Sequence, residues 1–164
     1  MAGWLASLHV MRVTDSRQYL LRPLHVLPQI DGPRSALIFD CQKCNAEEPK
    51  TQVWVSYREA TGYDMDLPPL YKDKVSVHWL RLNNGGANAG TIVQKTLGVG
   101  EAYQVPQTGH VIRVCALRPS SQPESAVVTI TMPGSSASLA TSLCGSSQPP
   151  PSRPSPPPPP PPPV

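Results

Sequence analysis

Residues 51–58 read Thr-Gln-Val-Trp-Val-Ser-Tyr-Arg, and residues 74–82 read Lys-Val-Ser-Val-His-Trp-Leu-Arg-Leu. An apolar residue occupies every second position of both stretches, namely Val53, Val55, Tyr57, Val75, Val77 and Trp79. Because successive side chains of a strand point to opposite faces, this period of two predicts two half-buried β-strands. We expect both valine rows to face a common core.

Five further stretches have the same extended, apolar character and are separated by Gly-, Pro- and Asn-rich turns: residues 18–27, 35–40, 91–97, 110–117 and 126–132. Pro23 within the first of them and Pro28 directly after it lack backbone donors, so we expect an edge strand or a bulged strand there. About seven short strands without a helical stripe predict an all-β fold, an antiparallel β-sandwich of the Ig-like or jelly-roll-like kind. Its domain spans residues 1–133, and its predicted core includes Val53, Val55, Val75, Val77, Ile112 and Val114.

The C-terminal part of the chain changes character completely. Residues 134–148 are rich in Ser, Gly and Ala and predict a flexible linker. Residues 149–164 contain eight consecutive prolines, 156–163, which predict a polyproline II tail. At about 3.1 Å per residue that run spans roughly 25 Å, without a regular fold of its own. Composition alone leaves two interpretations open, an inert low-complexity tail and a spacer that anchors the protein in a cell wall.

Charge and hydropathy exclude several classes of partner. The net charge is only +3, and the basic residues are scattered along the chain, so we expect no nucleic-acid partner. No stretch approaches the roughly 20 apolar residues of a membrane span. Met1–Val13 lacks a basic start and a clean apolar run, which predicts no signal peptide in this chain. We therefore expect either a fragment of a longer secreted protein or a protein that stays inside the cell.

Four cysteines are present: Cys41, Cys44, Cys115 and Cys144. The first two form a lone C-x-x-C, and the other two are too far apart in sequence to complete a zinc ribbon. We expect one or two structural disulfides or free buried thiols. Four cysteines allow three pairings, and the spacing does not choose among them.

No catalytic, metal-binding or cofactor-binding constellation is recognisable. The four histidines, His9, His25, His78 and His110, are too widely spaced for the helical His-Glu-x-x-His pair of a zinc peptidase. Asp64 and Asp66 could contribute oxygen ligands to a calcium ion. An exposed turn that solvates both carboxylates is the interpretation that we favour for them. We predict no catalytic residue, no cofactor and no metal in this chain.

The segment from Trp54 to His78 resembles the gametolysin (autolysin) family, zinc metallopeptidases of volvocine green algae that degrade the glycoprotein cell wall. The resemblance rests on a set that we call the signature residues: Trp54, Ser56, Tyr57, Arg58, Gly62, Tyr63, Asp64, Val75, Val77 and His78. It extends more weakly over residues 2–132, beginning with Gly3-Trp4. The family's zinc-binding histidine motif and methionine turn are absent, and we expect them to lie before Met1.

The resemblance implies a non-catalytic C-terminal part of a gametolysin-like metallopeptidase that acts on the algal extracellular matrix. It implies an extracellular location, matrix glycoproteins as partners, and zinc only in a full-length relative. The alternative is a structural hydroxyproline-rich wall glycoprotein of the pherophorin type, although such domains are richer in cysteine. A third hypothesis is an intracellular ligand whose tail engages proline-rich-motif binders such as SH3-like or profilin-like domains.

Overall fold

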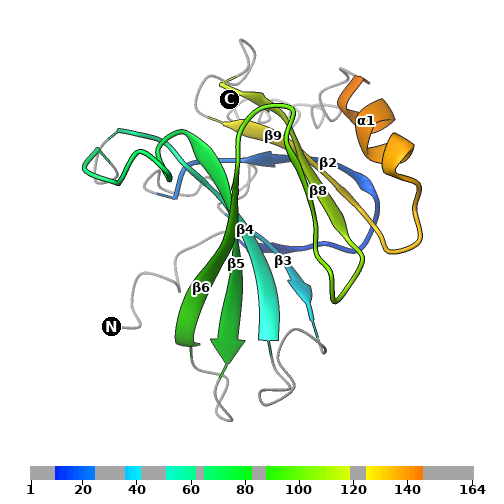
Figure 1. Ribbon diagram of the computed structural model, residues 1–164, viewed down its shortest axis with the longest axis horizontal. Helices are drawn as coiled ribbons and strands as arrows, with labels where there is room; N and C mark the ends of the chain where they lie inside the picture. Colours follow the sequence, from blue (N-terminus) through cyan, green and yellow to red (C-terminus); the bar gives the residue numbers. More distant parts are fainter. Residues whose placement is uncertain are drawn as a thin grey trace, which may run out of the picture.

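The computed structural model describes residues 10–24, 36–41, 51–61, 65–82, 88–118 and 125–145, which form two β-sheets and one short helix (Figure 1). The first sheet has the order β1 (Val10–Arg12), β3 (Ala36–Asp40), β4 (Thr51–Arg58), β5 (Lys74–Leu82) and β6 (Asn88–Leu97). The second has the order β2 (Arg17–Leu21), β9 (Ala126–Thr131), β8 (Val111–Leu117) and β7 (Ala102–Gln104). The predicted all-β sandwich is confirmed.

Six of these strands coincide closely with predicted stretches, and β4 and β5 match their predicted bounds. β2 covers only the first part of the stretch predicted at 18–27, because it ends at Leu21, before Pro23. The strand predicted at an edge, β2, does lie at an edge of its sheet. The prediction missed β1 and β7, because three residues are too few to display a period of two. The purely antiparallel prediction needs one correction, since β1 pairs with β3 in parallel.

The core lies between the two sheets and is built from the residues whose alternation predicted it. Its predicted members, Val53, Val55, Val75, Val77, Ile112 and Val114, are all 0% exposed. In the first sheet, Val55 is opposite Val77 on the neighbouring strand. In the second, Ile112 is opposite Ile130. Both sheets therefore contribute one apolar face to a single cluster.

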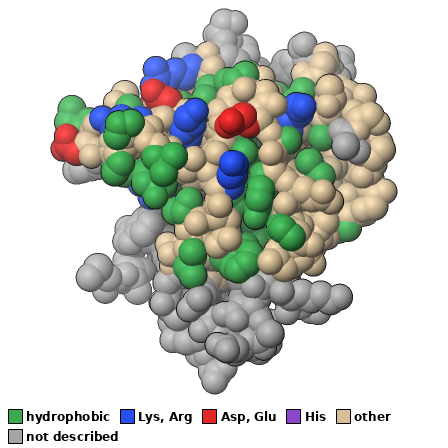
Figure 2. Space-filling view, in the orientation of Figure 1, with side chains coloured by type: hydrophobic (Ala, Val, Ile, Leu, Met, Phe, Trp, Pro, Cys, Tyr) green, Lys and Arg blue, Asp and Glu red, His purple; other side chains and the backbone are tan. Residues whose placement is uncertain are grey.

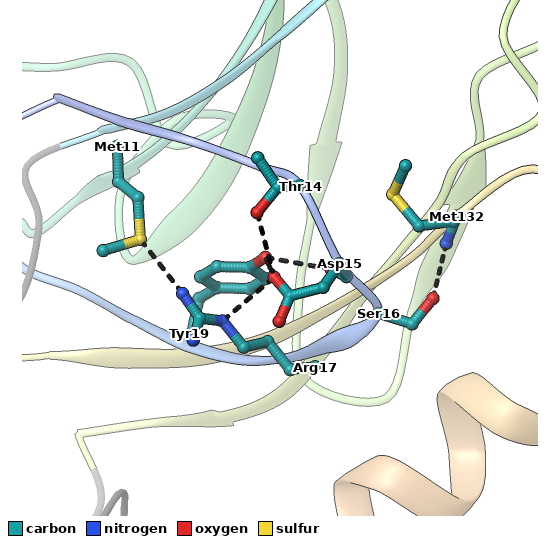
Figure 3. A network of polar contacts seen from close by, with 7 residues as sticks. All are labelled: Met11, Thr14, Asp15, Ser16, Arg17, Tyr19 and Met132. Carbon is teal, nitrogen blue, oxygen red and sulfur yellow. Dashed lines mark hydrogen bonds and ion pairs between the residues drawn. The ribbon is translucent and has the colours of Figure 1, made fainter.

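The chain crosses from one sheet to the other in the short corner between β1 and β2 (Figure 3). The Tyr19 hydroxyl donates to the backbone oxygen of Asp15 at 2.9 Å and lies 3.0 Å from its carboxylate. The Ser16 hydroxyl accepts a 2.8 Å hydrogen bond from the backbone N–H of Met132. Burial raises the pKa of Tyr19, so the hydroxyl stays a donor. These hydrogen bonds hold the corner between β1 and β2 in place, so we assign its residues a role in stabilising the fold.

The predicted flexible linker is wrong in its first part, because α1 (Ala137–Gly145) packs beside β8 and β9 (Figure 1). Ala140 is only 2% exposed, and a disulfide joins Cys144 in the helix to Cys115 in β8. Composition favoured a linker, and these tertiary contacts override it. The rest of the linker and the proline-rich tail, residues 146–164, lie outside the described residues. In the described part of the chain, no helix is long and apolar enough to cross a membrane.

Candidate functional site

The loop between β4 and β5, residues 59–73, is closed at its base by three charged side chains. Arg118, directly after β8, places Nε 2.8 Å from Glu59 Oε1 and Nη2 2.7 Å from Asp73 Oδ1. The same Asp73 oxygen accepts a 3.2 Å hydrogen bond from the backbone N–H of Ala60. Glu59, Asp73 and Arg118, which we call the clamp, thus tie the ends of β4, β5 and β8 together.

The clamp also holds two unusual backbone conformations. Asp73 has a φ of 52° and Arg118 a φ of 49°, and among the described residues no other non-glycine residue has a positive φ. The left-handed region costs an L-residue roughly 1–2 kcal/mol, somewhat less for Asp than for Arg. Both strained residues belong to one ion-pair group. Strain of this kind persists only where surrounding contacts enforce it, and it concentrates at binding and catalytic sites.

The loop stands out from the side of the sandwich and ends in an apolar tip (Figures 1 and 2). Met65 is 59% exposed and Leu70 is 61% exposed, and Pro68 and Pro69 between them are exposed as well. The backbone N–H of Tyr71 donates to the carbonyl of Pro68 at 2.9 Å, which closes a turn at the tip. A projecting apolar surface with a fixed base can bind a partner at a small cost in conformational entropy.

The chemistry of the clamp favours binding and not catalysis. Both carboxylates already accept charge-assisted hydrogen bonds from one guanidinium, so neither is set up as a general base. Among the described residues, no group of three or more His, Cys, Asp or Glu side chains is placed to hold a metal ion. Gly62, Tyr63 and Asp64 lie outside the described residues. The choice between a calcium ligand and a solvated turn for Asp64 and Asp66 therefore stays open, and Asp66 itself is exposed.

A serine and a histidine meet on the outer face of the first sheet. Ser56 Oγ lies 3.4 Å from His78 Nε2, and Ser56 is only 3% exposed. Burial, and secondarily the positive charge of Arg58, lowers the pKa of His78 to about 4, so the imidazole is neutral at pH 7. A nucleophilic serine requires a base that a third group orients. Among the described residues, no group hydrogen-bonds His78 Nδ1, so nothing described there orients the imidazole.

The structure shows why most signature residues are present. Tyr57, Val75 and Val77 are 0% exposed and belong to the core, so their role is packing. Trp54, Ser56 and His78 occupy the opposite face of the same sheet, where Trp54 is opposite His78. Arg58 is the last residue of β4. The signature therefore describes two adjacent strands and the approach to the clamped loop.

The clamp was not predicted from the sequence. Asp73 and Arg118 are 45 positions apart, and no local pattern pairs them. The sequence signals only that Asp73 directly precedes one strand, β5, and that Arg118 directly follows another, β8. Only the strand order brings these two strand ends together.

The cysteine question is settled for three of the four residues. Cys115 is bonded to Cys144, and Cys41 is disulfide-bonded as well. Free thiols, one of the two expectations, are wrong for these three. Cys44 lies outside the described residues.

No family model matches the chain, and neither a curated protein nor a solved structure matches it. The likeness to gametolysins therefore rests on the signature residues alone.

Proposed function

We propose that the chain is the non-catalytic C-terminal part of a gametolysin-like metallopeptidase that acts on the extracellular matrix of a green alga, and that this β-sandwich module binds the matrix. The observation that carries this proposal is the Cys115–Cys144 disulfide. It connects the last described element covalently to the sandwich, directly before the proline-rich tail. The proline-rich tail therefore follows a helix that a disulfide cross-links to the sandwich.

Disulfides support the extracellular part of the proposal. Bonds of this kind persist in oxidising compartments and are rare in the cytosol. Cys41 is bonded too, so at least three of the four cysteines in the chain are oxidised. This pattern disfavours the intracellular ligand hypothesis.

The clamped loop supports the binding part of the proposal. Met65 and Leu70 form an exposed apolar tip that the sandwich itself does not need for packing. The tail offers a second contact, because an extended proline-rich rod suits entanglement with similar rods in a wall. We propose that the loop contacts matrix glycoprotein and that the tail retains the module there.

Sedimentation with isolated algal cell walls tests this function. The oxidised full chain should sediment with the walls, and a chain that lacks residues 146–164 should be retained much less. A double variant, Met65→Ser with Leu70→Ser, should also weaken retention. Val99→Ser is the matched control, because Val99 is equally exposed, at 59%, but lies in another turn.

The pattern of losses discriminates between the two extracellular hypotheses. If the loop variant binds like the unchanged chain and only the tail deletion loses binding, the pherophorin-like structural glycoprotein is favoured. If the full chain does not bind walls at all, the proposed function is wrong.

A further inference from the structure

We propose that the Cys115–Cys144 disulfide is a thiol-sensitive latch, whose reduction releases α1 from the second sheet while the sandwich stays folded. Opening this latch lengthens the connection between the sandwich and the tail. That consequence rests on the proposed function, whereas the latch itself depends only on the contacts of α1.

The helix has little of its own to hold it in place. It is nine residues long and reads Ala-Ser-Leu-Ala-Thr-Ser-Leu-Cys-Gly, with no acidic residue in its first turn and no basic residue in its last. Isolated helices shorter than about 12–15 residues are marginal in water. Among the side chains of the helix that the structure describes, only the small Ala140 is fully buried, and Leu139 and Leu143 are half-buried. The helix therefore depends on its attachments to the sheet.

Two side chains of the second sheet also hydrogen-bond the backbone of the helix, in addition to the disulfide and the packing of Ala140. Thr129 Oγ1 donates to the backbone oxygen of Ala140 at 3.3 Å, and Gln18 Nε2 donates to the backbone oxygen of Leu143. The Leu143 carbonyl is among the last four of the helix and lacks an intrahelical partner, so Gln18 satisfies a group that water could also satisfy. The Ala140 carbonyl lies within the helix, and Thr129 is an additional donor to it. Exchange of such bonds with water changes the free energy little. The covalent bond is therefore the strongest restraint on α1.

The surface under the helix tolerates exposure. On β9, Val128 and Ile130 face the core, whereas Thr129 and Thr131 alternate with them and face the opposite side. Release of α1 thus frees the Thr129 hydroxyl and the Gln18 amide from the helix, whereas Val128 and Ile130 stay in the core between the sheets. Cys115 lies at the irregularity of β8 between Val114 and Ala116, where the ladder to β9 is already interrupted. Opening the bond therefore removes no regular pairing between strands.

The chemistry is ordinary thiol–disulfide exchange with a dithiol reductant. One thiolate of the reductant attacks a sulfur of the Cys115–Cys144 bond, and the other cysteine leaves as a thiolate and takes a proton. The second thiol of the reductant then displaces the first cysteine, which also ends as a thiol. The reductant is oxidised to its own disulfide, and two cysteine thiols result. Release of residues 133–145 adds up to about 40 Å of reach to the tail.

Hydrogen exchange on the full chain, read by mass spectrometry, tests the latch. In the oxidised protein, the backbone amides of residues 137–145 should be protected. After dithiothreitol treatment, and in Cys144→Ser without reductant, they should exchange at least tenfold faster, while those of β5 stay slow. Cys144→Ser leaves Cys41 unchanged, so it separates this bond from the other disulfide. Dithiothreitol acts on chain that is already folded, which covers the case in which the variant folds poorly.

Three outcomes would overturn the latch. In the first, α1 stays protected after the bond is opened, so the noncovalent contacts suffice. In the second, β5 loses protection together with α1, so the bond stabilises the whole sandwich. In the third, Thr129→Val frees α1 while the disulfide is intact, so the hydrogen bond is the main restraint. None of these readouts involves cell walls, so they are independent of the test of matrix binding.

Discussion

Glu59 is the residue on which the candidate site depends most. Its side chain is 10% exposed, and a carboxylate that deep requires a counter-charge or several donors. Arg118 supplies the charge, and the Thr61 hydroxyl donates a further hydrogen bond at 3.3 Å. The contact with the nearly buried Glu59 therefore holds Arg118 in its left-handed backbone conformation. The ion pair between Glu59 and Arg118 therefore fixes the base of the loop between β4 and β5.

Replacement of Arg118 by alanine should destabilise the protein by about 1–3 kcal/mol, because Glu59 loses its charged hydrogen-bond partner. Thermal unfolding of the oxidised chain at pH 7 measures the effect. Arg113→Ala is the control, since the Arg113 guanidinium donates to the backbone oxygen of Gly100 at 3.0 Å and holds no buried carboxylate. As an exposed substitution it should cost no more than about 0.5 kcal/mol. Equal effects for the two variants would contradict the clamp.

The protein should become less stable as the pH falls from about 6.5 to about 4, in part because of His78. Its folded-state pKa is about 4, so between these values the unfolded chain binds a proton that the folded chain does not. Stability therefore decreases with decreasing pH, by at most about 3 kcal/mol for this residue. Burial also lowers the pKa of His110, which acts in the same direction. Denaturant unfolding at pH 7 and pH 4.5 should show a smaller loss for His78→Gln, and an unchanged loss contradicts this account.

At the scale of the elements, strands with a repeating pattern could be predicted and contact-dependent elements could not. β4 and β5 display four or five alternations each, which is enough to fix their type and bounds. β1, β7 and α1 have no such signal. The helix forms where a Ser- and Gly-rich composition favours a loop, because Cys144 and Ala140 meet the second sheet. No local sequence pattern predicts that Cys144 pairs with Cys115, which lies 29 positions away.

Two of the isoleucines in the sandwich offer a matched test of which face of each strand is buried. Ile112 in β8 is 0% exposed, and Ile92 in β6 is 41% exposed. Ile112→Val should destabilise the protein by about 0.5–1.5 kcal/mol, because it leaves a small cavity in the core. Ile92→Val should change stability by less, as solvent fills the space. Chemical denaturation compares the two variants, and a larger effect at Ile92 would show that the inner faces are assigned wrongly.

At the scale of the whole molecule, the described residues form one sandwich with a cross-linked helix at its end. The clamp fastens one projecting loop, and the disulfide fastens α1 to the second sheet. Both devices join elements far apart in sequence. Among the described residues, they leave the tip of the loop, with exposed Met65 and Leu70, as a surface that the core does not require. The candidate site could therefore not be predicted before the strand order was known.

Deletion of residues 146–164 should leave the melting temperature of the oxidised protein unchanged within about 1 °C. The tail has almost no apolar side chains to bury, so burial cannot offset the ordering cost of about 1–2 kcal/mol per residue. Differential scanning calorimetry compares the full and shortened chains. A drop of several degrees would mean that the tail packs on the sandwich, and the spacer role would then be wrong.

The most direct test of the central claim, matrix binding without catalysis, is one incubation of the oxidised full chain with purified cell-wall glycoprotein. Electrophoresis of the mixture, with and without a zinc chelator, reads the integrity of the glycoprotein. Because the chain has no closely spaced histidine pair, we expect the glycoprotein to remain intact under both conditions. Fragments that appear without the chelator and disappear with it would contradict the claim and make this chain a metallopeptidase in its own right.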